Sequence, residues 1–350
     1  MSAPVAGAVA VLGGTGCMGR HICAAFAGRG ARVVAVSRRR TPVVDAYRFL
    51  PMDVVQCTAE ELAAVLTAER VDTVVNATLG WGRTEEEMGY TNVRLVERLL
   101  DAARSMAHPP RLVHLGTIHE YGPVSHGTLI DEGLPPRPQT LYARAKLTAS
   151  RMVLDAVRAG LLDGIVLRVT NTIGPYPAPE SFFGALAARL RDVAAGEGVE
   201  LTVADARRDY VDVRDAADAV VRAARSPLAD PLVNLGRGEA LHIRELVDAL
   251  VRATGLPPES IRERPGDVAG RSAGADWIRV DNSRAGRLLG WRPRYDVDAS
   301  MRDLWDTVRP APPMSSRASS GSPNSATTVL CEVDPARRRR SPGGDGRRRR

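Results

Sequence analysis

Lysine is almost absent from this chain. Of its 48 lysine and arginine residues, Lys146 is the single lysine, and every other cationic side chain is an arginine. A lysine ammonium is a compact charge, whereas a guanidinium is a wide planar fork, so a lone lysine indicates a position where arginine does not serve. Tyr142 precedes it by four residues, which on a helix places the phenol and the ammonium on one face. The spacing alone fits an ordinary amphipathic helix, or an acid–base pair in which the lysine lowers the tyrosine pKa.

Cysteines and long apolar runs are also scarce. The four cysteines form no Cys-x-x-Cys pair, which argues against a disulfide framework and a structural metal. The histidines His114, His119 and His126 have no ligand-like spacing either. No uncharged apolar run reaches about 18 residues, so we expect no membrane span, and the first residues lack the basic region of a signal peptide. We therefore expect a reduced, cytoplasmic protein without a metal.

The excess of positive charge lies in one segment. The formal net charge is +7, but residues 310–350 hold nine arginines and three acids, which leaves the rest of the chain close to neutral. That balance weakens a nucleic-acid interpretation of the fold. The segment is rich in Pro, Ser, Gly and Arg, so we expect a disordered tail. Its arginine runs, 337–340 and 347–350, could still bind nucleic acid non-specifically.

A glycine-rich loop follows the first apolar stretch. Residues 8–13 read as a wholly apolar strand, typical of a parallel strand buried on both faces, and a helical stretch runs from the loop to about Arg29. Glycines at such a place allow a tight turn against a pyrophosphate, to which the helix N-terminus offers free N–H groups. We therefore expect a dinucleotide site. Its expected contacts in the loop are Gly13, Gly16, Cys17, Met18 and Gly19.

The end of the second strand, residues 31–37, should lie near the adenosine ribose. An NAD-preferring site carries Asp or Glu there, but this chain has Ser37, Arg38 and Arg39. No carboxylate would repel a 2′-phosphate, and arginines pair with it. The turn therefore predicts NADP(H), unless the arginines only form a solvated turn.

The alternation of apolar strands and helices continues to residue 116. Further strands are expected near 47–50, at 71–77 and at 111–116, with a long helix over 84–106. This order is typical of an α/β fold with a doubly wound parallel sheet, in which ligands bind beyond the carboxyl ends of the strands. Additional cofactor contacts are expected from Asp53, Val54, Ala77 and Asn92.

Four motifs now stand in order, and together they resemble the extended short-chain dehydrogenase/reductases, in their epimerase/dehydratase branch. The resemblance spans about residues 6–308. The motifs are Gly13-x-x-Gly16-x-x-Gly19, Thr117 followed by Tyr121-Gly122, Tyr142-x-x-x-Lys146, and Leu167-Arg168 leading to Asn171 and Gly174-Pro175.

The resemblance implies a role for each site residue. Tyr142 would be the proton donor to a carbonyl, Lys146 would bond the nicotinamide ribose and lower the tyrosine pKa, and Thr117 would hold the reacting oxygen. Within the motif at 208–215, Arg208 resembles a diphosphate ligand. The implied substrate contacts are His119, Asn171, Arg208 and Arg271.

The resemblance also implies a division of the chain and a partner. An NADP-binding Rossmann domain would span 6–170, and a smaller α/β domain for a sugar nucleotide would span 171–309, with late elements returning to the sheet. The family often dimerises through the helices that hold 84–106 and 142–160. Both have apolar stripes, which a homodimer or a monomer's core would use equally.

The choice among the family's reactions depends on two positions. Dehydratases of this branch carry Asp-Glu where this chain has Ile118 and His119, so dehydration is not expected. The Ser37 turn favours an exchangeable NADPH, which suits net reduction. The closer resemblance is to 4-ketoreductases of antibiotic deoxysugar pathways, which implies reduction of the C4 ketone of a TDP-4-keto-6-deoxyhexose. The alternatives are an NAD-dependent nucleotide-sugar 4-epimerase and a non-catalytic NADP-binding regulator.

Overall fold

The computed structural model describes residues 7–80, 84–192, 198–226, 231–264 and 275–309. Arg271 and the expected tail, 310–350, lie outside the described residues.

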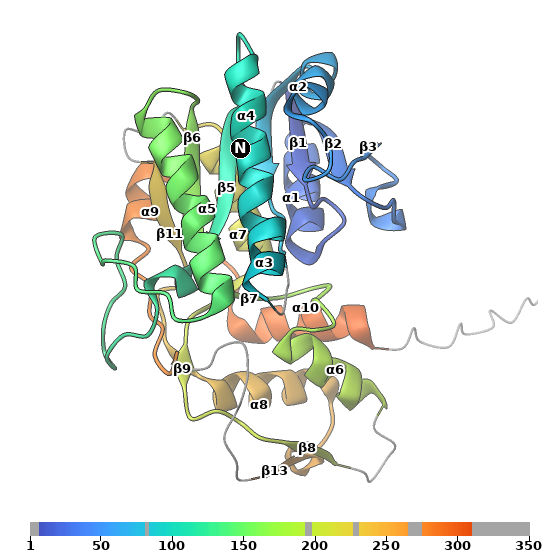
Figure 1. Ribbon diagram of the computed structural model, residues 1–350. Coiled ribbons are helices and arrows are strands. Elements are labelled where there is room, and N and C mark those ends of the chain that lie inside the picture. The colour runs from blue at the N-terminus through green and yellow to red at the C-terminus, as the bar shows by residue number, and fades with distance from the viewer. Residues whose placement is uncertain (1–6, 81–83, 193–197, 227–230, 265–274, 310–350) are drawn as a thin grey trace, which may run out of the picture. The chain divides into compact units, whose positions relative to one another are not determined.

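The core of the fold is a seven-stranded sheet with the order β11-β6-β5-β4-β1-β2-β3. All six strand pairs are parallel, so the expected doubly wound parallel sheet is confirmed (Figure 1). Apolar runs form its centre because side chains on both faces are covered, as in β1, where all five residues are buried. The strands are β1 (Ala8–Leu12), β2 (Arg32–Ser37), β3 (Arg48–Pro51), β4 (Val71–Asn76), β5 (Arg111–Thr117), β6 (Gly164–Val169) and β11 (Leu232–Leu235).

Helices cover both faces of this sheet. Alternate strand residues point to opposite faces, so Leu112 joins one apolar cluster and its neighbour Val113 joins the other. The cluster of Leu112 packs under α2 (Ala59–Ala68), α4 (Arg94–Ser105) and α5 (Leu141–Arg158). The cluster of Val113 packs under α1 (Cys17–Ala27), α7 (Val213–Ala223) and α9 (Ser283–Leu289).

The long helix expected over 84–106 forms in three pieces. These are α3 (Glu85–Met88), a π-helical turn (Gly89–Val93) and α4. The apolar residues of α4 and α5, such as Leu99 and Val153, are buried against the sheet. Their apolar stripes therefore belong to the core of the single chain, and neither stripe requires a second copy.

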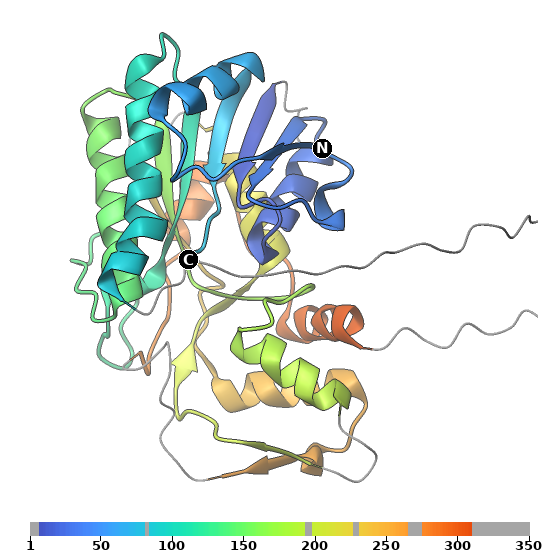
Figure 2. The ribbon, with the colours of Figure 1, turned by 45° about the vertical axis from the view of Figure 1, so that its right-hand side comes forward.

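A second layer of helices lies beyond the carboxyl ends of the strands, as both views show (Figures 1 and 2). The helices of this layer are α6, α8 and α10, and they share an apolar cluster that includes Phe183, Leu246 and Leu304, one residue from each. Three short strand pairs border these helices: β7 with β10, β8 with β13, and β9 with β12. The elements are β7 (Asn171–Ile173), α6 (Phe182–Asp192), β8 (Val199–Leu201), β9 (Arg207–Arg208), β10 (Tyr210–Asp212), β12 (Leu241–His242), α8 (Ile243–Thr254), β13 (Ile261–Glu263) and α10 (Val297–Val308).

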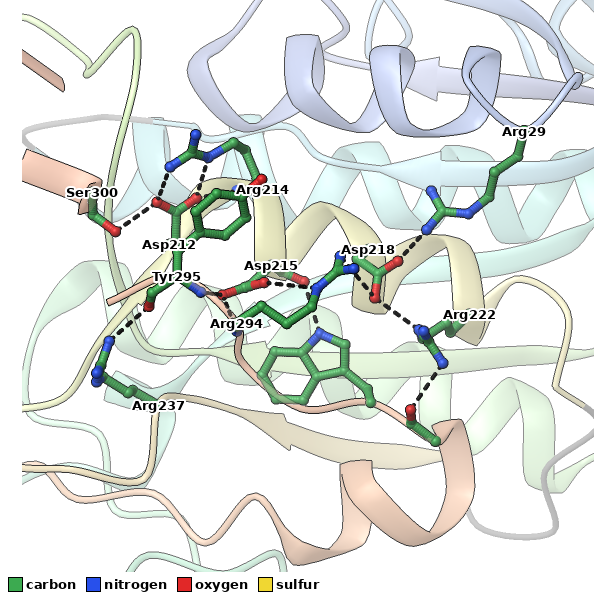
Figure 3. Close-up of polar contacts among 12 residues, drawn as sticks. Arg29, Asp212, Arg214, Asp215, Asp218, Arg222, Arg237, Arg294, Tyr295 and Ser300 are labelled. Carbon is green, nitrogen blue, oxygen red and sulfur yellow. Dashed lines mark hydrogen bonds and ion pairs between the residues drawn. The ribbon is translucent and has the colours of Figure 1, made fainter. Parts of the chain in front are cut away.

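Carboxylates along α7 fix the last segments of the described chain (Figure 3). The Oδ2 atom of Asp215 accepts the backbone N–H groups of Arg294 and Tyr295 at 2.8 and 3.0 Å. The indole of Trp291, 1% exposed, donates to the Asp215 carbonyl oxygen at 2.9 Å. Asp218 pairs with Arg222 at 2.8 Å and also with Arg29, which lies two residues beyond the end of α1. These bonds attach the 291–295 segment to the helix that packs on the sheet.

Candidate cofactor and catalytic site

The expected cofactor and catalytic residues follow several different strands of one parallel sheet. Parallel strands end at the same edge, so segments that are distant in sequence meet there. Gly13 follows β1, Ser37 ends β2, Ala77 follows β4 and Thr117 ends β5. The sheet order therefore places the expected contacts along a single edge.

The loop between β1 and α1 packs closely because its glycines have no side chains, and this leaves room for a ligand. Gly13 has a φ of +78°, and its N–H donates to the Val36 carbonyl at 2.9 Å. A Cβ at Gly19 would lie 2.0 Å from the Gly13 oxygen, so the close packing of loop and helix requires glycine. Gly16 precedes α1 without any side-chain cap, so the helix N–H groups stay available for an anion. This cradle fits a pyrophosphate.

The turn after β2 presents exposed guanidinium groups. The Ser37 hydroxyl donates to the Arg39 carbonyl at 2.8 Å and shapes the turn. Arg40 pairs with Asp45 at 2.9 Å, whereas Arg38 and Arg39 are exposed and form no ion pair within the described residues. Two guanidinium groups therefore remain for a phosphate.

The remaining expected cofactor contacts differ in burial and in hydrogen bonding. Ala77 lies beside the glycine loop, since a Cβ at Gly13 would meet its carbonyl oxygen at 3.1 Å. Asn92, 4% exposed, lies in the π-helical turn and donates to the Met88 carbonyl at 3.0 Å. Its Oδ1 atom is buried without a hydrogen-bond partner in the described structure. Asp53 accepts the Val55 N–H at 3.1 Å in a local turn, and the neighbouring side chain of Val54 is buried.

Thr117, Tyr142 and Lys146 come together at the end of β5 and the first turns of α5. Thr140 caps α5 by accepting the Ala143 N–H at 3.1 Å. The helix therefore begins just before Tyr142, and Tyr142 and Lys146 lie one turn apart on the same face. The Tyr142 phenol and the Thr117 side chain form a hydrogen bond. Lys146 is 3% exposed. The three residues that the motifs indicated are therefore one cluster.

The charges around this cluster differ from the expectation. Burial raises the pKa of the Tyr142 phenol, the negative charge of Glu120 raises it further, and the Thr117 hydrogen bond opposes the rise. Burial lowers the pKa of Lys146 to about 8, and Glu120 acts against that change. The sequence-based expectation of a lowered tyrosine pKa is therefore wrong for the free protein. Desolvation disfavours the phenolate more strongly than its surroundings favour it.

Glu120 is the residue that the sequence analysis missed. Its side chain is 0% exposed and pairs with Arg168 at 2.7 Å, whose side chain is 4% exposed. The Oε1 atom accepts the Thr117 N–H and the Ser150 hydroxyl, both at 2.9 Å. A Cβ at Gly116 would lie 2.5 Å from Oε1, so the glycine makes room for the carboxylate. An acid directly beside an active-site motif, with an arginine on the next strand, was the available signal.

Two of the expected substrate contacts meet, and a third is near them. The ring Nε2 of His119 lies 3.3 Å from Asn171 Oδ1, and the Asn171 amide donates to the Asp209 carbonyl at 3.3 Å. Burial lowers the pKa of His119, the bond to Asn171 opposes this, and the positive charge of Arg208 adds to it. Arg208 donates to the Ala275 carbonyl at 2.7 Å. The fourth expected contact, Arg271, lies outside the described residues.

The acids of the 208–215 segment fix the backbone around Arg208. Asp209 accepts the N–H groups of Arg237, Gly238 and Val280 at 2.7, 2.8 and 3.2 Å. Asp212 caps α7 and accepts the Ser300 hydroxyl at 2.6 Å (Figure 3). With Asp215, these acids hold three later segments of the chain in place. The segment therefore combines the half-buried Arg208 with a set of structural carboxylates.

None of the helices in the described residues is long and apolar enough to cross a membrane. No group of three or more His, Cys, Asp or Glu side chains in those ranges could hold a metal ion.

Comparison with known proteins agrees with the geometry. The model of the NAD dependent epimerase/dehydratase family matches residues 9–236. A dTDP-6-deoxy-L-talose 4-dehydrogenase (NAD(P)(+)) from Kitasatospora kifunensis is 42% identical over 308 residues, which are 87% of this chain and 96% of the relative.

Solved structures show the same fold. A UDP-glucose 4-epimerase from Brucella ovis in complex with NAD has a TM-score of 0.74 at 26% identity, covering 87% of this chain and 98% of its own. RMD from Pseudomonas aeruginosa complexed with NADPH has a TM-score of 0.72 at 22% identity, with 87% and 98% covered. With a glycine cradle at β1 and a Thr, Tyr and Lys cluster at β5 and α5, this chain belongs to the NAD dependent epimerase/dehydratase family.

Proposed function

We propose that this protein reduces the C4 ketone of a TDP-4-keto-6-deoxyhexose with NADPH, in the formation of an antibiotic deoxysugar. The observation that carries the proposal is the cluster of Thr117, Tyr142 and Lys146 at the end of β5 and the start of α5, with a tyrosine that keeps its proton. The relative from Kitasatospora kifunensis is named for the oxidation of a dTDP-6-deoxy sugar at C4. Reduction is the reverse of that reaction and passes through the same transition state.

Each residue of the cluster has a task that its position supports. Tyr142 donates its phenolic proton to the oxygen that develops negative charge, since its raised pKa keeps it protonated at neutral pH. Thr117 bonds the phenol and is placed to orient the same oxygen. Lys146, charged below about pH 8, binds the ribose next to the nicotinamide. When bound, NADPH would supply the hydride for the ketone carbon.

The remaining residues support NADPH and a sugar nucleotide as the pair of ligands. The glycine cradle and the α1 N-terminus suit a pyrophosphate, and Arg38 and Arg39 suit a 2′-phosphate. His119 and Asn171 would contact the sugar, and Arg208 and Arg271 the diphosphate. At neutral pH His119 is uncharged because burial lowers its pKa, so it would bond a hydroxyl of the sugar and not an anion.

The test is NADPH oxidation with TDP-4-keto-6-deoxyglucose as substrate. Wild-type protein should turn over, and Tyr142→Phe should lose about 10²–10⁴-fold in kcat while it binds NADPH as tightly as the wild type. The C4 configuration of the product names the sugar series. A wild type that oxidises no NADPH, but releases bound NAD on denaturation, would replace this proposal with a 4-epimerase. NADPH binding without any sugar chemistry would favour a regulator.

A further inference from the structure

The buried carboxylate of Glu120 contacts the catalytic cluster through the backbone of Thr117. Three groups hold it: the Arg168 guanidinium at 2.7 Å, the Thr117 N–H at 2.9 Å and the Ser150 hydroxyl at 2.9 Å. One partner is therefore the backbone of a catalytic residue, and another lies on the same helix as Tyr142 and Lys146. A carboxylate with 0% exposed area and this many bonds is held in one position.

The ion pair with Arg168 does not cancel the electrostatic effect of the Glu120 charge on Tyr142 and Lys146. Its guanidinium contacts Oε2 and also stacks on the Tyr121 ring, with 4.5 Å between its Cζ atom and the ring centroid. Oε1, by contrast, faces Thr117 and Ser150. The negative charge of Glu120 acts on both Tyr142 and Lys146, and it raises the pKa of each.

Resting on the proposed function, we propose that Glu120 is a positioning residue that makes this site a proton donor. Its bonds fix Thr117 against Tyr142, and its charge, held inside the protein by Arg168, keeps the phenol protonated and the Lys146 ammonium charged. Without that charge, a fully buried lysine would lose its proton more easily. The cluster then carries the proton that reduction of a ketone requires at neutral pH.

Other titratable groups around the cluster do not supply this effect. His114 on β5 lies near Lys146, and burial lowers its pKa well below the ordinary value. Burial also lowers the pKa of His119 in the adjoining turn and raises that of Tyr121. All three stay neutral between about pH 7 and 9, where a histidine or tyrosine with such shifts does not change its charge. Among the residues that the structure describes, Glu120 is the charged group that acts on both Tyr142 and Lys146, and Arg168 is its partner.

The single lysine gives a direct measurement. Protein labelled with carbon-13 at lysine Cε yields one signal, because Lys146 is the chain's only lysine, and its shift against pH reports the ammonium titration. We expect a wild-type midpoint near pH 8 and a midpoint lower by about one pH unit in Glu120→Gln. Reduction of the keto sugar should fail at a correspondingly lower pH in that variant. An unchanged midpoint in folded Glu120→Gln would overturn the proposal.

Matched variants separate charge from structure. Ser150→Ala removes one bond to Glu120 but no charge, and Asp155→Asn removes an exposed carboxylate, 71% exposed, from the same helix; both should leave the midpoint in place. If Glu120→Gln does not fold with Arg168 unpaired, the neutral pair Glu120→Gln with Arg168→Met should fold. Its midpoint should fall by less than in the single variant, because a positive charge is lost as well. A midpoint that rises or stays in this pair would also overturn the proposal.

The titration needs no substrate, so its outcome is independent of the sugar. If wild-type protein reduces no keto sugar while the lysine midpoint still falls in Glu120→Gln, the proposed function fails and the charge effect of Glu120 stands. If the sugar is reduced but the midpoint does not move, the inference fails and the proposed function stands.

Discussion

The Thr117 side chain and the Tyr142 phenol form a hydrogen bond although one ends strand β5 and the other lies in the first turn of helix α5. The bond fixes the phenol relative to the sheet edge where the glycine loop also lies. The Thr117 backbone is also held, because its N–H donates to Glu120 at 2.9 Å. The position of the proposed proton donor is thus determined by the sheet and not by the helix alone.

Replacing Thr117 tests that relationship. Thr117→Val keeps the side-chain volume but removes the hydroxyl that would orient the reacting oxygen. We expect kcat to fall about 10²–10³-fold, as for the loss of one oxyanion donor, with little change in NADPH affinity. Thr117→Ser retains the hydroxyl and should keep most of the rate. Equal rates in the Val and Ser variants would show that the hydroxyl takes no part.

Cofactor preference should depend on the exposed turn after β2. Replacing Arg38 and Arg39 by Ala would remove the proposed charge-assisted bonds to a 2′-phosphate, each worth about 1.5–3 kcal/mol. The KM for NADPH should rise about 100-fold or more, and the KM for NADH should change little. Arg40→Ala is the matched control, because Arg40 already pairs with Asp45 at 2.9 Å. Parallel loss of both cofactors in the double variant would contradict a 2′-phosphate contact.

The rate of reduction should decline as the pH rises through about 8. Lys146 has its pKa lowered to about 8 by burial, so it is charged below that pH and neutral above it. The Tyr142 pKa is raised, so the phenol keeps its proton over the same interval. Steady-state rates across pH 6 to 10 would locate the midpoint. In Lys146→Arg the decline should disappear at a lower overall rate, and a persistent decline would assign it to another group.

Asp215 should matter for stability and not for chemistry. Asp215→Ala leaves the N–H groups of Arg294 and Tyr295 without their acceptor, which costs about 1–3 kcal/mol of unfolding free energy. The control is Asp45→Ala, which removes a carboxylate that is 59% exposed and should cost less than about 1 kcal/mol of unfolding free energy. Urea unfolding of the wild type and of both variants would measure the two losses. A similar loss in the two variants would mean that the α7 contacts contribute little.

The sequence was informative about the sheet, because short apolar runs and glycines have few alternative structures. The positions of the strands follow from local patterns, whereas the cluster of Thr117, Tyr142 and Lys146 was expected from the family resemblance, because the spacing of Tyr142 and Lys146 alone also fits an ordinary helix. Glu120 did not, because a buried charge is recognised by its partners, and Arg168 and Ser150 lie on other elements. The direction of the tyrosine pKa was missed for the same reason. Burial is a property of the packed fold, and residue spacing does not measure it.

The network that holds Arg208 has a consequence for how the protein matures during synthesis. Arg208 donates to the Ala275 carbonyl, and its neighbour Asp209 accepts the Val280 N–H. Neither bond can form until residues 275 and 280 have been synthesised. The glycine loop, Thr117, Tyr142 and Lys146 are all complete much earlier in the chain, and domains form from the N-terminus as synthesis proceeds. A nascent chain that ends before residue 275 would therefore carry the glycine loop while Arg208 still lacks its partner Ala275. Of the two proposed sites, the one for the cofactor would form first and the one for the sugar nucleotide last.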